Sequence, residues 1–388
     1  MTKQVLHVSD THLGKRQYGS DARRADFADA FEQAIRYAID EDVDAVIHTG
    51  DLFDTREPRL PDLNRCIDTL ELLDDSGIPF YGIVGNHERK MDAQYLDLIH
   101  KTGTAKRLSK SPTMIGDEVA LYGIDAVTKP AWHTEDFTLE EPPSNAFTIL
   151  CMHELLHPPV PELFADHPLD DVLDRVNVDL DALALGDYHA TVSTVERGTT
   201  VWYAGSTERC ALDEDAPRTV SLLEIDDGEM TRREKELDTR DFLQIDIQLT
   251  EGDGNAYLKD VVDRYEVDSS VAIVKLTGEP STVTSRDVRK VVMNRGAAVC
   301  QVDDQRGGPD VDLSEGPTGG IEGSDKLIED KLAEQDLSDV ALQVEERVRT
   351  EDTSPTGFDE KVRRIVREEL AEEPDDHASV GSEAGGAK

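Results

Sequence analysis

Five short apolar segments in the first half of the chain each end in a group of polar residues. Stretches with helical periodicity lie between them, so the order of elements indicates an α/β fold. Ligands of open α/β sheets bind at the carboxyl ends of the strands, so we expect the five groups to meet at one site. The five pairs of segment and polar group are residues 5–9 with Asp10-Thr11-His12, residues 45–49 with Gly50-Asp51, residues 80–84 with Gly85-Asn86-His87-Glu88, residues 147–152 with His153-Glu154, and residues 182–185 with Gly186-Asp187-Tyr188-His189.

Helices are expected at residues 22–39 and 63–73, where apolar residues recur at helical spacing, and a further strand is expected at residues 201–204. The density of short apolar runs after Gly116 predicts a second sheet that is more antiparallel than the first.

The second half of the chain changes character after residue 238. We predict a large α/β domain at residues 1–238 and a small α/β cap at residues 239–303. The cap alternates strands (242–249, 271–276, 297–302) with helices (256–265, 285–293). Residues 304–323 are rich in Gly, Pro and Asp and predict a flexible linker. Two amphipathic helices within residues 324–374 and a disordered tail at 375–388 complete the prediction.

The net charge is strongly negative, 41 − 83 = −42. Periodic apolar segments argue against a disordered acidic protein, so the charge favours a salt-adapted surface. At about 1 M salt the Debye length is roughly 3 Å and self-repulsion is largely screened. We therefore predict a halophilic, archaeal protein. The chain has no long apolar run, no signal-peptide pattern and four scattered cysteines without a CxxC pair, which predicts a cytoplasmic protein with no membrane contact.

The residue types at the strand ends suit a metal centre. Asp10 and His12 are two apart and would point the same way on an extended segment, and Gly50 and Gly85 permit close backbone approach. Imidazoles mixed with carboxylates favour manganese, iron or zinc over calcium. About seven ligands are too many for one metal site. Two ions that share a carboxylate need about that number. Each motif alone is more often a turn or a helix cap, so their joint occurrence carries the prediction.

These motifs together resemble the signature of the calcineurin-like metallophosphoesterases, over roughly the first 210 residues. The resemblance implies two β-sheets packed face to face with helices outside, and two-metal hydrolysis of a phosphoester. It implies roles for seven residues. Asp10, His12 and His189 would hold the first metal, Asp51 would bridge, Asn86 and His153 would hold the second, and His87 would face the phosphate and protonate the leaving oxygen.

Two further acidic residues, Asp187 and Asp54, each have two possible roles. Family members usually have Gly-His-x-His where this chain has Gly186-Asp187-Tyr188-His189. Asp187 would ligate the second metal and favour a harder ion such as Mn²⁺; the alternative is that it only caps a turn. Asp54 would pair with His87 and keep the imidazole protonated, the alternative being a simple turn residue.

The layout further resembles the archaeal nuclease of DNA double-strand break repair, the meiotic recombination eleven family. Residues 50–54, residues 204–209 and the order of parts carry this resemblance. It implies a manganese-dependent exonuclease and endonuclease acting on double-strand DNA ends. It also implies a homodimer and a partner, the coiled-coil ABC-type ATPase.

The cap is less acidic than the rest, with seven basic and six acidic residues at 256–295. Arg286, Arg289, Lys290 and Arg295 are candidate DNA phosphate contacts, the alternative being a solvated helix face. The apolar stripe of the terminal helices would dock on the ATPase or, alternatively, on the chain's own core; it comprises Phe358, Val362, Ile365 and Leu370.

Two other functions remain open on the sequence alone. The core motifs also permit a phosphoesterase acting on nucleotides or phosphoproteins, although a small-molecule enzyme has no need of a partner-binding tail. A non-catalytic scaffold is the second alternative, and the presence of His87 argues against it.

Overall fold

The computed structural model describes residues 2–90, 93–143 and 145–306. Most of the predicted linker, the predicted helices at 324–374 and the tail lie outside the described residues, as do the candidate partner-binding residues Phe358, Val362, Ile365 and Leu370. The chain divides into two compact units. Among the described residues, the first contains those of 2–245, Tyr257–Val274 and Arg286–Gln301, and the second contains Asp246–Ala256, Lys275–Ser285 and residues 302–306.

The first six-stranded sheet carries three of the predicted strand ends. Its order is β14 (Glu229–Glu236), β13 (Thr219–Asp226), β1 (Lys3–Val8), β2 (Ala45–His48), β3 (Phe80–Gly82) and β4 (Lys106–Arg107). The neighbours β1, β2, β3 and β4 run parallel, whereas β13 pairs antiparallel with β1 and with β14. The strand ends after β1, β2 and β3 therefore lie at one edge of this sheet.

The second six-stranded sheet carries the other two predicted strand ends. Its order is β11 (Val192–Glu196), β12 (Thr199–Tyr203), β10 (Ala182–Gly186), β7 (Phe147–His153), β6 (Val119–Gly123) and β5 (Thr113–Ile115). The central strands β12, β10, β7 and β6 are parallel, and only the edge strands β11 and β5 pair antiparallel. The expectation of a more antiparallel second sheet is wrong, because both sheets have three parallel and two antiparallel pairings.

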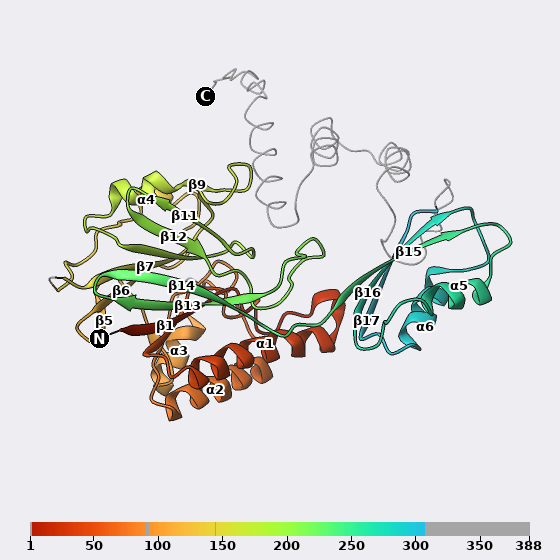
Figure 1. Ribbon diagram of the computed structural model, residues 1–388, viewed down its shortest axis with the longest axis horizontal. Coiled ribbons are helices and arrows are strands. Elements are labelled where there is room, and N and C mark those ends of the chain that lie inside the picture. The colour runs from red at the N-terminus through yellow and green to blue at the C-terminus, as the bar shows by residue number, and fades with distance from the viewer. Residues whose placement is uncertain (1, 91–92, 144, 307–388) are drawn as a thin grey trace, which may run out of the picture. The chain divides into compact units, whose positions relative to one another are not determined.

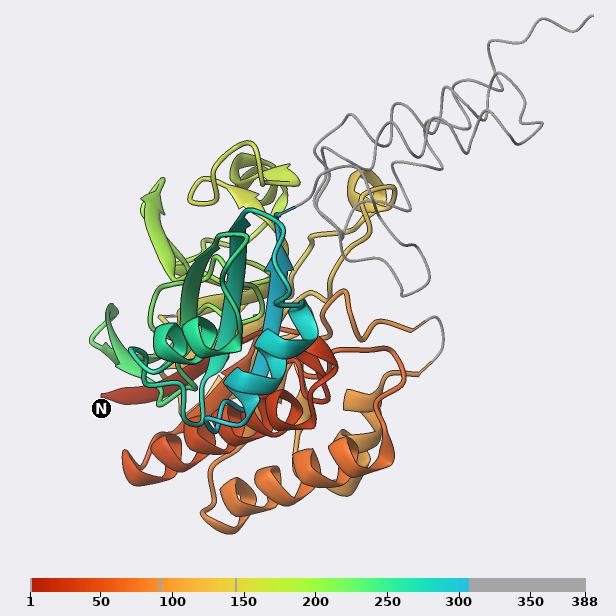
Figure 2. The same cartoon turned by 90° about the vertical axis from the view of Figure 1, so that its right-hand side faces the viewer.

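Helices cover the outer faces of the two sheets (Figure 1). The helices α1 (Asp21–Asp40), α2 (Leu60–Asp75) and α3 (Tyr95–Thr102) lie on the first sheet, and α4 (Leu169–Arg175) lies on the second. Figure 2 shows α1 and α2 side by side. Short elements complete this part: η1 (Gln17–Gly19), η2 (Trp132–Thr134), β8 (Leu156–His157) and β9 (His167–Pro168). No helix in the described part of the chain is long and apolar enough to cross a membrane.

Successive side chains on each strand point to opposite faces of the sheet and pack into two different cores. In β1, Val5 packs between the sheets, whereas Leu6 faces α1 and α2. In β7, Ile149 packs between the sheets, whereas Leu150 faces the outer layer with α4. Strands buried on both faces are uninterrupted apolar runs in the sequence. The predicted two-sheet sandwich flanked by helices is confirmed.

A smaller three-stranded sheet follows, with the order β15 (Phe242–Leu249), β16 (Val271–Gly278) and β17 (Val299–Asp304). Two helices, α5 (Asn255–Val262) and α6 (Ser285–Met293), connect the strands. The buried residues of α6 are Val288, Val291 and Val292, so one face of the helix packs and the opposite face is open to solvent. This strand–helix alternation is the one expected for the cap.

Candidate metal centre

The loops that follow β1 and β2 run beside each other and carry the first ligand candidates. The Asp10 N–H donates to the Gly50 carbonyl at 3.2 Å, and the His12 N–H donates to the Asp51 carbonyl at 3.0 Å. Asp10, His12 and Asp51 all have a positive φ, between 43° and 54°. The expectation that Asp10 and His12 lie on an extended segment is therefore wrong. Left-handed backbone at non-glycine residues is uncommon, and clusters of it mark functional sites.

Two glycines let these loops close around the ligand candidates. Gly50 has φ +96°, and a Cβ there would lie 2.5 Å from His153 Nδ1. A Cβ at Gly85 would collide with the side chain and the main-chain nitrogen of Asp51. The close approach expected for both glycines is present, and it brings strand ends from the two sheets together.

Asp10, Asp51 and His153 form one compact group of buried side chains, with ligand atoms within 4.8 Å of one another. The distance from His153 Nε2 to Asp51 Oδ1 is 3.5 Å, and that to Asp187 Oδ1 is 3.6 Å. The Asp187 N–H donates to both carboxylate oxygens of Asp10 at 3.2 Å. Asn86 is exposed, and its Nδ2 donates to Asp187 Oδ1 at 2.9 Å.

His12 and His189 face each other beside this group. Their Nε2 atoms are 3.2 Å apart, and Asp51 Oδ2 lies 3.8 Å from His12 Nε2. Asp51 thus turns one carboxylate oxygen toward His153 and the other toward His12. That is the position a bridging carboxylate takes between two ions.

Hydrogen bonds from the outer ring nitrogens fix the tautomers of two histidines. His153 Nδ1 lies 2.7 Å from the Thr49 carbonyl, and His189 Nδ1 lies 2.8 Å from Glu214 Oε1. Since a carbonyl or carboxylate oxygen only accepts, each Nδ1 carries the proton. With Nδ1 as the donor, Nε2 is the atom that each ring turns inward, as in metal-ligating histidines.

A further observation indicates that these residues fit a bound cation. Buried atoms without a hydrogen-bond partner include Asp51 Oδ2 and His153 Nε2. An unsatisfied buried polar atom costs about 1–3 kcal/mol, and more when charged. A divalent ion would satisfy inward-facing carboxylate and imidazole atoms together, which explains why they are collected here.

The carboxylates of the site differ in their electrostatic environment. Burial raises the pKa of Asp51, but the facing imidazoles of His153, His12 and His87 outweigh burial and lower it below its usual range. Burial raises the pKa of Asp187 to about 6; His153 opposes this, and the negative charges of Asp51 and Asp10 add to it. Positive charge among these buried acids favours their ionised forms.

His87 lies at the rim of this group, with its side chain 33% exposed and Nε2 4.0 Å from Asp51 Oδ2. Its Nδ1 lies 3.1 Å from the main-chain carbonyl of Asp54. The Asp54 carboxylate is 4.0 Å from His87 Nδ1 but 3.4 Å from His12 Nδ1 and 2.9 Å from Lys15 Nζ. The predicted Asp54–His87 pair is thus made by the backbone, and the carboxylate serves other partners.

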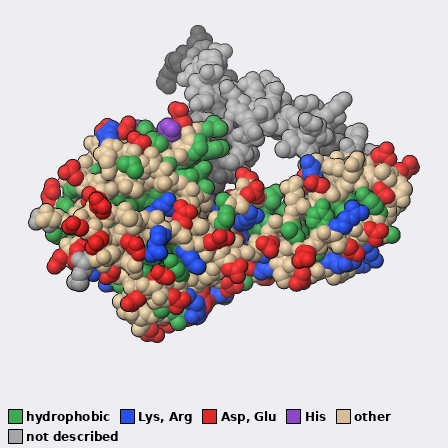
Figure 3. Space-filling model, viewed as in Figure 1, with side chains coloured by type: hydrophobic (Ala, Val, Ile, Leu, Met, Phe, Trp, Pro, Cys, Tyr) green, Lys and Arg blue, Asp and Glu red, His purple; other side chains and the backbone are tan. Residues whose placement is uncertain are grey.

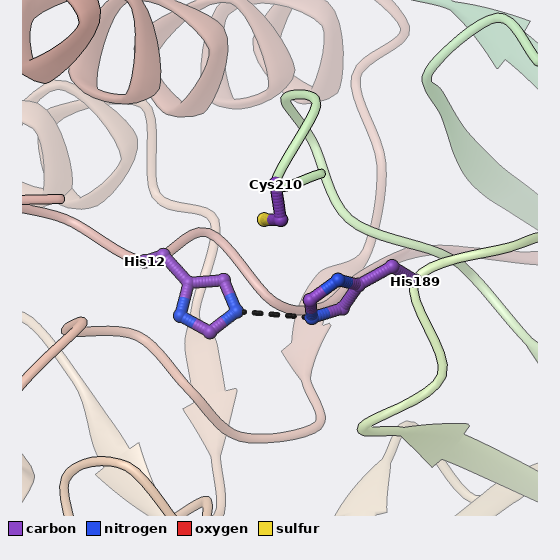
Figure 4. A group of neighbouring side chains, drawn as sticks. All are labelled: His12, His189 and Cys210. Carbon is purple, nitrogen blue, oxygen red and sulfur yellow. Dashed lines mark hydrogen bonds between the residues drawn. The ribbon is translucent and has the colours of Figure 1, made fainter. Parts of the chain in front are cut away.

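Two residues near the site were not predicted from the sequence, namely Cys210 and Glu214. Cys210 groups with His12 and His189, with ligand atoms within 4.8 Å (Figure 4). Glu214 orients His189. The only sequence signal was the neighbouring segment 204–209, because an isolated Cys or Glu in a loop has no diagnostic spacing.

The candidate DNA-contact residues of the cap are all exposed. Arg286, Arg289 and Lys290 lie on α6, opposite its buried valines. Arg295 follows the helix and is paired with Asp263. Lys and Arg side chains gather over α5 and α6 on the face shown in Figure 3.

Comparisons with known proteins agree with this geometry. Residues 3–191 match the model of the calcineurin-like phosphoesterase family. The chain is 38% identical over 373 residues to the DNA double-strand break repair protein Mre11 of Haloferax volcanii, covering 96% of this chain and 83% of that protein. It is 36% identical over 382 residues to the protein of the same name from Halobacterium salinarum, covering 96% of each.

Among solved structures, a dimetal phosphatase from Danio rerio is similar at 12% identity and a TM-score of 0.36, covering 60% of this chain and 96% of that one. The sequence relatives extend well beyond the phosphoesterase domain into the rest of the chain. The chain is therefore a calcineurin-like phosphoesterase and belongs to the Mre11 family of DNA double-strand break repair proteins.

Proposed function

We propose that this protein is a manganese-dependent DNA nuclease, with exonuclease and endonuclease activity, that processes double-strand breaks by two-metal hydrolysis of phosphodiester bonds. It works as a cytoplasmic homodimer in a complex with a coiled-coil ABC-type ATPase. The observation that carries the proposal is the buried group of Asp51, His12 and His153, in which Asp51 Oδ2 and His153 Nε2 have no hydrogen-bond partner and the two Asp51 oxygens lie 3.8 Å from His12 Nε2 and 3.5 Å from His153 Nε2. The relatives of the chain are named for double-strand break repair.

The proposed roles divide the ligand candidates between two ion positions. Asp10, His12 and His189 hold the first ion, and Asp51 lies between both positions. Asn86, His153 and Asp187 hold the second, with the Asn86 amide nitrogen already bound to Asp187 Oδ1 and its oxygen left for the ion. Two bound divalent ions supply the positive charge that favours attack of water on phosphorus.

His87 is the proposed proton donor to the leaving oxygen. Its Nδ1–H donates to the Asp54 carbonyl, which fixes the ring and turns Nε2 toward Asp51. The protonated imidazole would carry a second N–H at Nε2, the proton that His87 would donate to the leaving oxygen. One-third exposure of the side chain leaves room for a phosphate beside it.

Residues outside the phosphoesterase domain support the proposed partners. Exposed Arg286, Arg289 and Lys290 support contacts with DNA phosphates, whereas Arg295 is engaged with Asp263. Phosphate contacts weaken steeply with salt, so a salt-adapted nuclease depends more on its metals and on the ATPase to hold DNA. The apolar stripe within residues 324–374 is the proposed ATPase contact.

The test compares wild type with His87→Ala on linear duplex DNA in Mn²⁺. We expect kcat to fall about 10²- to 10⁴-fold, the usual contribution of a general acid, with Mn²⁺ binding retained. His133→Ala is the matched control, because His133 is exposed and lies outside the buried group.

Two results would contradict the proposal. Equal DNA hydrolysis by wild type and His87→Ala would assign the chain a scaffold role. Hydrolysis of a nucleotide substrate or of a phosphoprotein, without hydrolysis of DNA, would assign it to another activity of the phosphoesterase fold.

A further inference from the structure

The facing imidazoles of His12 and His189 define a position for one ion. Two nitrogens that each lie about 2.1 Å from one metal are separated by about 3.0 Å at an octahedral angle and about 3.4 Å at a tetrahedral one. The observed separation of the two Nε2 atoms is 3.2 Å. With the His189 proton on Nδ1, this spacing is that of two ligands of a single ion.

Cys210 lies beside this pair (Figure 4). The carboxylate that orients His189 also holds the backbone of Cys210. Glu214 Oε1 accepts from His189 Nδ1 at 2.8 Å, and Oε2 accepts from the Cys210 N–H at 2.7 Å. The Cys210 carbonyl accepts from Gln17 Nε2 at 2.9 Å. Arg218, itself 3% exposed, donates to Glu214 Oε2 at 3.2 Å. The backbone of Cys210 and the imidazole of His189 therefore hold their relative position through one anchored carboxylate.

An independent observation points into the same place. Asp51 Oδ2 has no hydrogen-bond partner, belongs to a side chain that is 1% exposed, and lies 3.8 Å from His12 Nε2. A buried, unpartnered carboxylate oxygen beside the two facing Nε2 atoms calls for a cation there. The thiol of Cys210 has its ligand atom within 4.8 Å of those of His12 and His189.

We propose that Cys210 is a metal ligand of this centre, joining His12 and His189, and that it makes this position select a thiophilic divalent ion such as Zn²⁺ over Mn²⁺. The inference rests on the proposed function and deepens it by making the two metal positions chemically unlike. Thiolate ligands favour zinc and iron, whereas carboxylate and amide oxygens favour manganese. The second position, with Asn86 and Asp187, keeps the manganese preference.

Ligation replaces one weak contact with a metal–sulfur bond. The thiol now lies 3.6 Å from the Glu208 carbonyl, to which it donates. On binding, the S–H bond breaks, the proton passes to buffer, and the sulfur electron pair forms the bond to the ion. Zn²⁺ binding should therefore release one more proton in wild type than in Cys210→Ser.

The experiment uses the full chain, freed of metal and titrated with Co²⁺ as a spectroscopic substitute for Zn²⁺. We expect intense near-ultraviolet sulfur-to-cobalt charge-transfer absorption in wild type and its loss in Cys210→Ser. Calorimetric titration should show Zn²⁺ affinity reduced about 10-fold or more in Cys210→Ser, with Mn²⁺ affinity changed less than about 3-fold. Cys300→Ser is the matched control, because Cys300 lies in the three-stranded sheet, and it should keep the absorption.

Circular dichroism confirms that each variant is folded, and the wild-type spectrum tests the inference without any variant. Absence of the charge-transfer absorption in wild type overturns it, as does an equal effect of Cys210→Ser on Zn²⁺ and Mn²⁺ affinity. If wild type hydrolyses DNA with Mn²⁺ but lacks the absorption, this inference fails and the proposed function stands. If the absorption is present and no metal supports DNA hydrolysis, the proposed function fails and Cys210 remains a ligand.

Discussion

Four of the candidate ligands are held in left-handed backbone conformations that their side chains disfavour. Asp10, His12 and Asp51 have φ between 43° and 54°, and Asp187 has φ 85°. Each such backbone conformation costs of order 1–3 kcal/mol of conformational free energy. It persists only where the surrounding structure holds the residue in place. Here the strain has a common result, since each residue turns its side chain into one small volume.

Asp187 is the ligand candidate on which the metal preference of the second position depends. We predict that Asp187→Asn lowers Mn²⁺ affinity about 10-fold, in line with the loss of a supporting or direct carboxylate, because a neutral amide attracts a hard ion less than a carboxylate does. Isothermal titration of the metal-free protein with Mn²⁺ measures this. Asp174→Asn is the control, since Asp174 is exposed and pairs with Arg197. A change below about twofold would mean that Asp187 only shapes the turn.

At the scale of elements, the two sheets are joined by a buried polar contact as well as by apolar packing. Trp202 Nε1 of β12 donates to His7 Nδ1 of β1 at 2.8 Å, so the His7 proton is on Nε2, which donates to Thr49 Oγ1 at 2.8 Å. Burial lowers the pKa of His7 well below its usual range, and the charges of His48 and Arg232 lower it further. The contact therefore requires a neutral imidazole.

A pH dependence follows for this sheet-to-sheet contact. Below about pH 6.5 the unfolded chain binds a proton at His7 that the folded chain does not, so His7 lowers the free energy of unfolding as pH falls. We predict that His7→Gln, whose amide can accept from Trp202 and donate to Thr49, is the less stable protein at pH 8. Its deficit should shrink by about 1.4 kcal/mol per pH unit below 6.5. Urea unfolding of both metal-free proteins at pH 8, 6 and 5 measures the difference, and a constant difference would refute it.

The elements that carry the site were predictable, because strands buried on both faces are continuous apolar runs and each ends in polar residues. β15 and α6 have the predicted bounds, and β2 and β7 differ by one residue. The direction of strand pairing in the second sheet was not predictable, since it depends on which distant segments meet. Cys210 and the Asp54 carbonyl were missed for the same reason, because their roles arise only from tertiary contacts.

At the scale of the whole molecule, the net charge of −42 opposes folding through self-repulsion. Asp and Glu side chains are spread over the face shown in Figure 3 rather than confined to one region. Many of the arginines already pair with acids, as Arg36 does with Glu32 and Arg233 with Glu224. The excess of carboxylates therefore depends on dissolved ions for neutralisation. Two relatives, from Haloferax volcanii and Halobacterium salinarum, are haloarchaeal proteins.

Stability should accordingly rise with ionic strength. The Debye length is about 10 Å at 0.1 M and about 3 Å at 1 M, so repulsion between neighbouring carboxylates is screened mainly across this interval. We predict that the full chain unfolds at a lower urea concentration in 0.1 M NaCl than in 2 M NaCl, and that KCl of equal ionic strength acts alike. Circular dichroism during urea titration measures both. Sucrose at equal osmolality is the control, because it is excluded from protein surfaces but screens no charge. Equal stabilisation by sucrose, or a urea midpoint indifferent to salt, would show that the acidic surface does not set the stability of this fold.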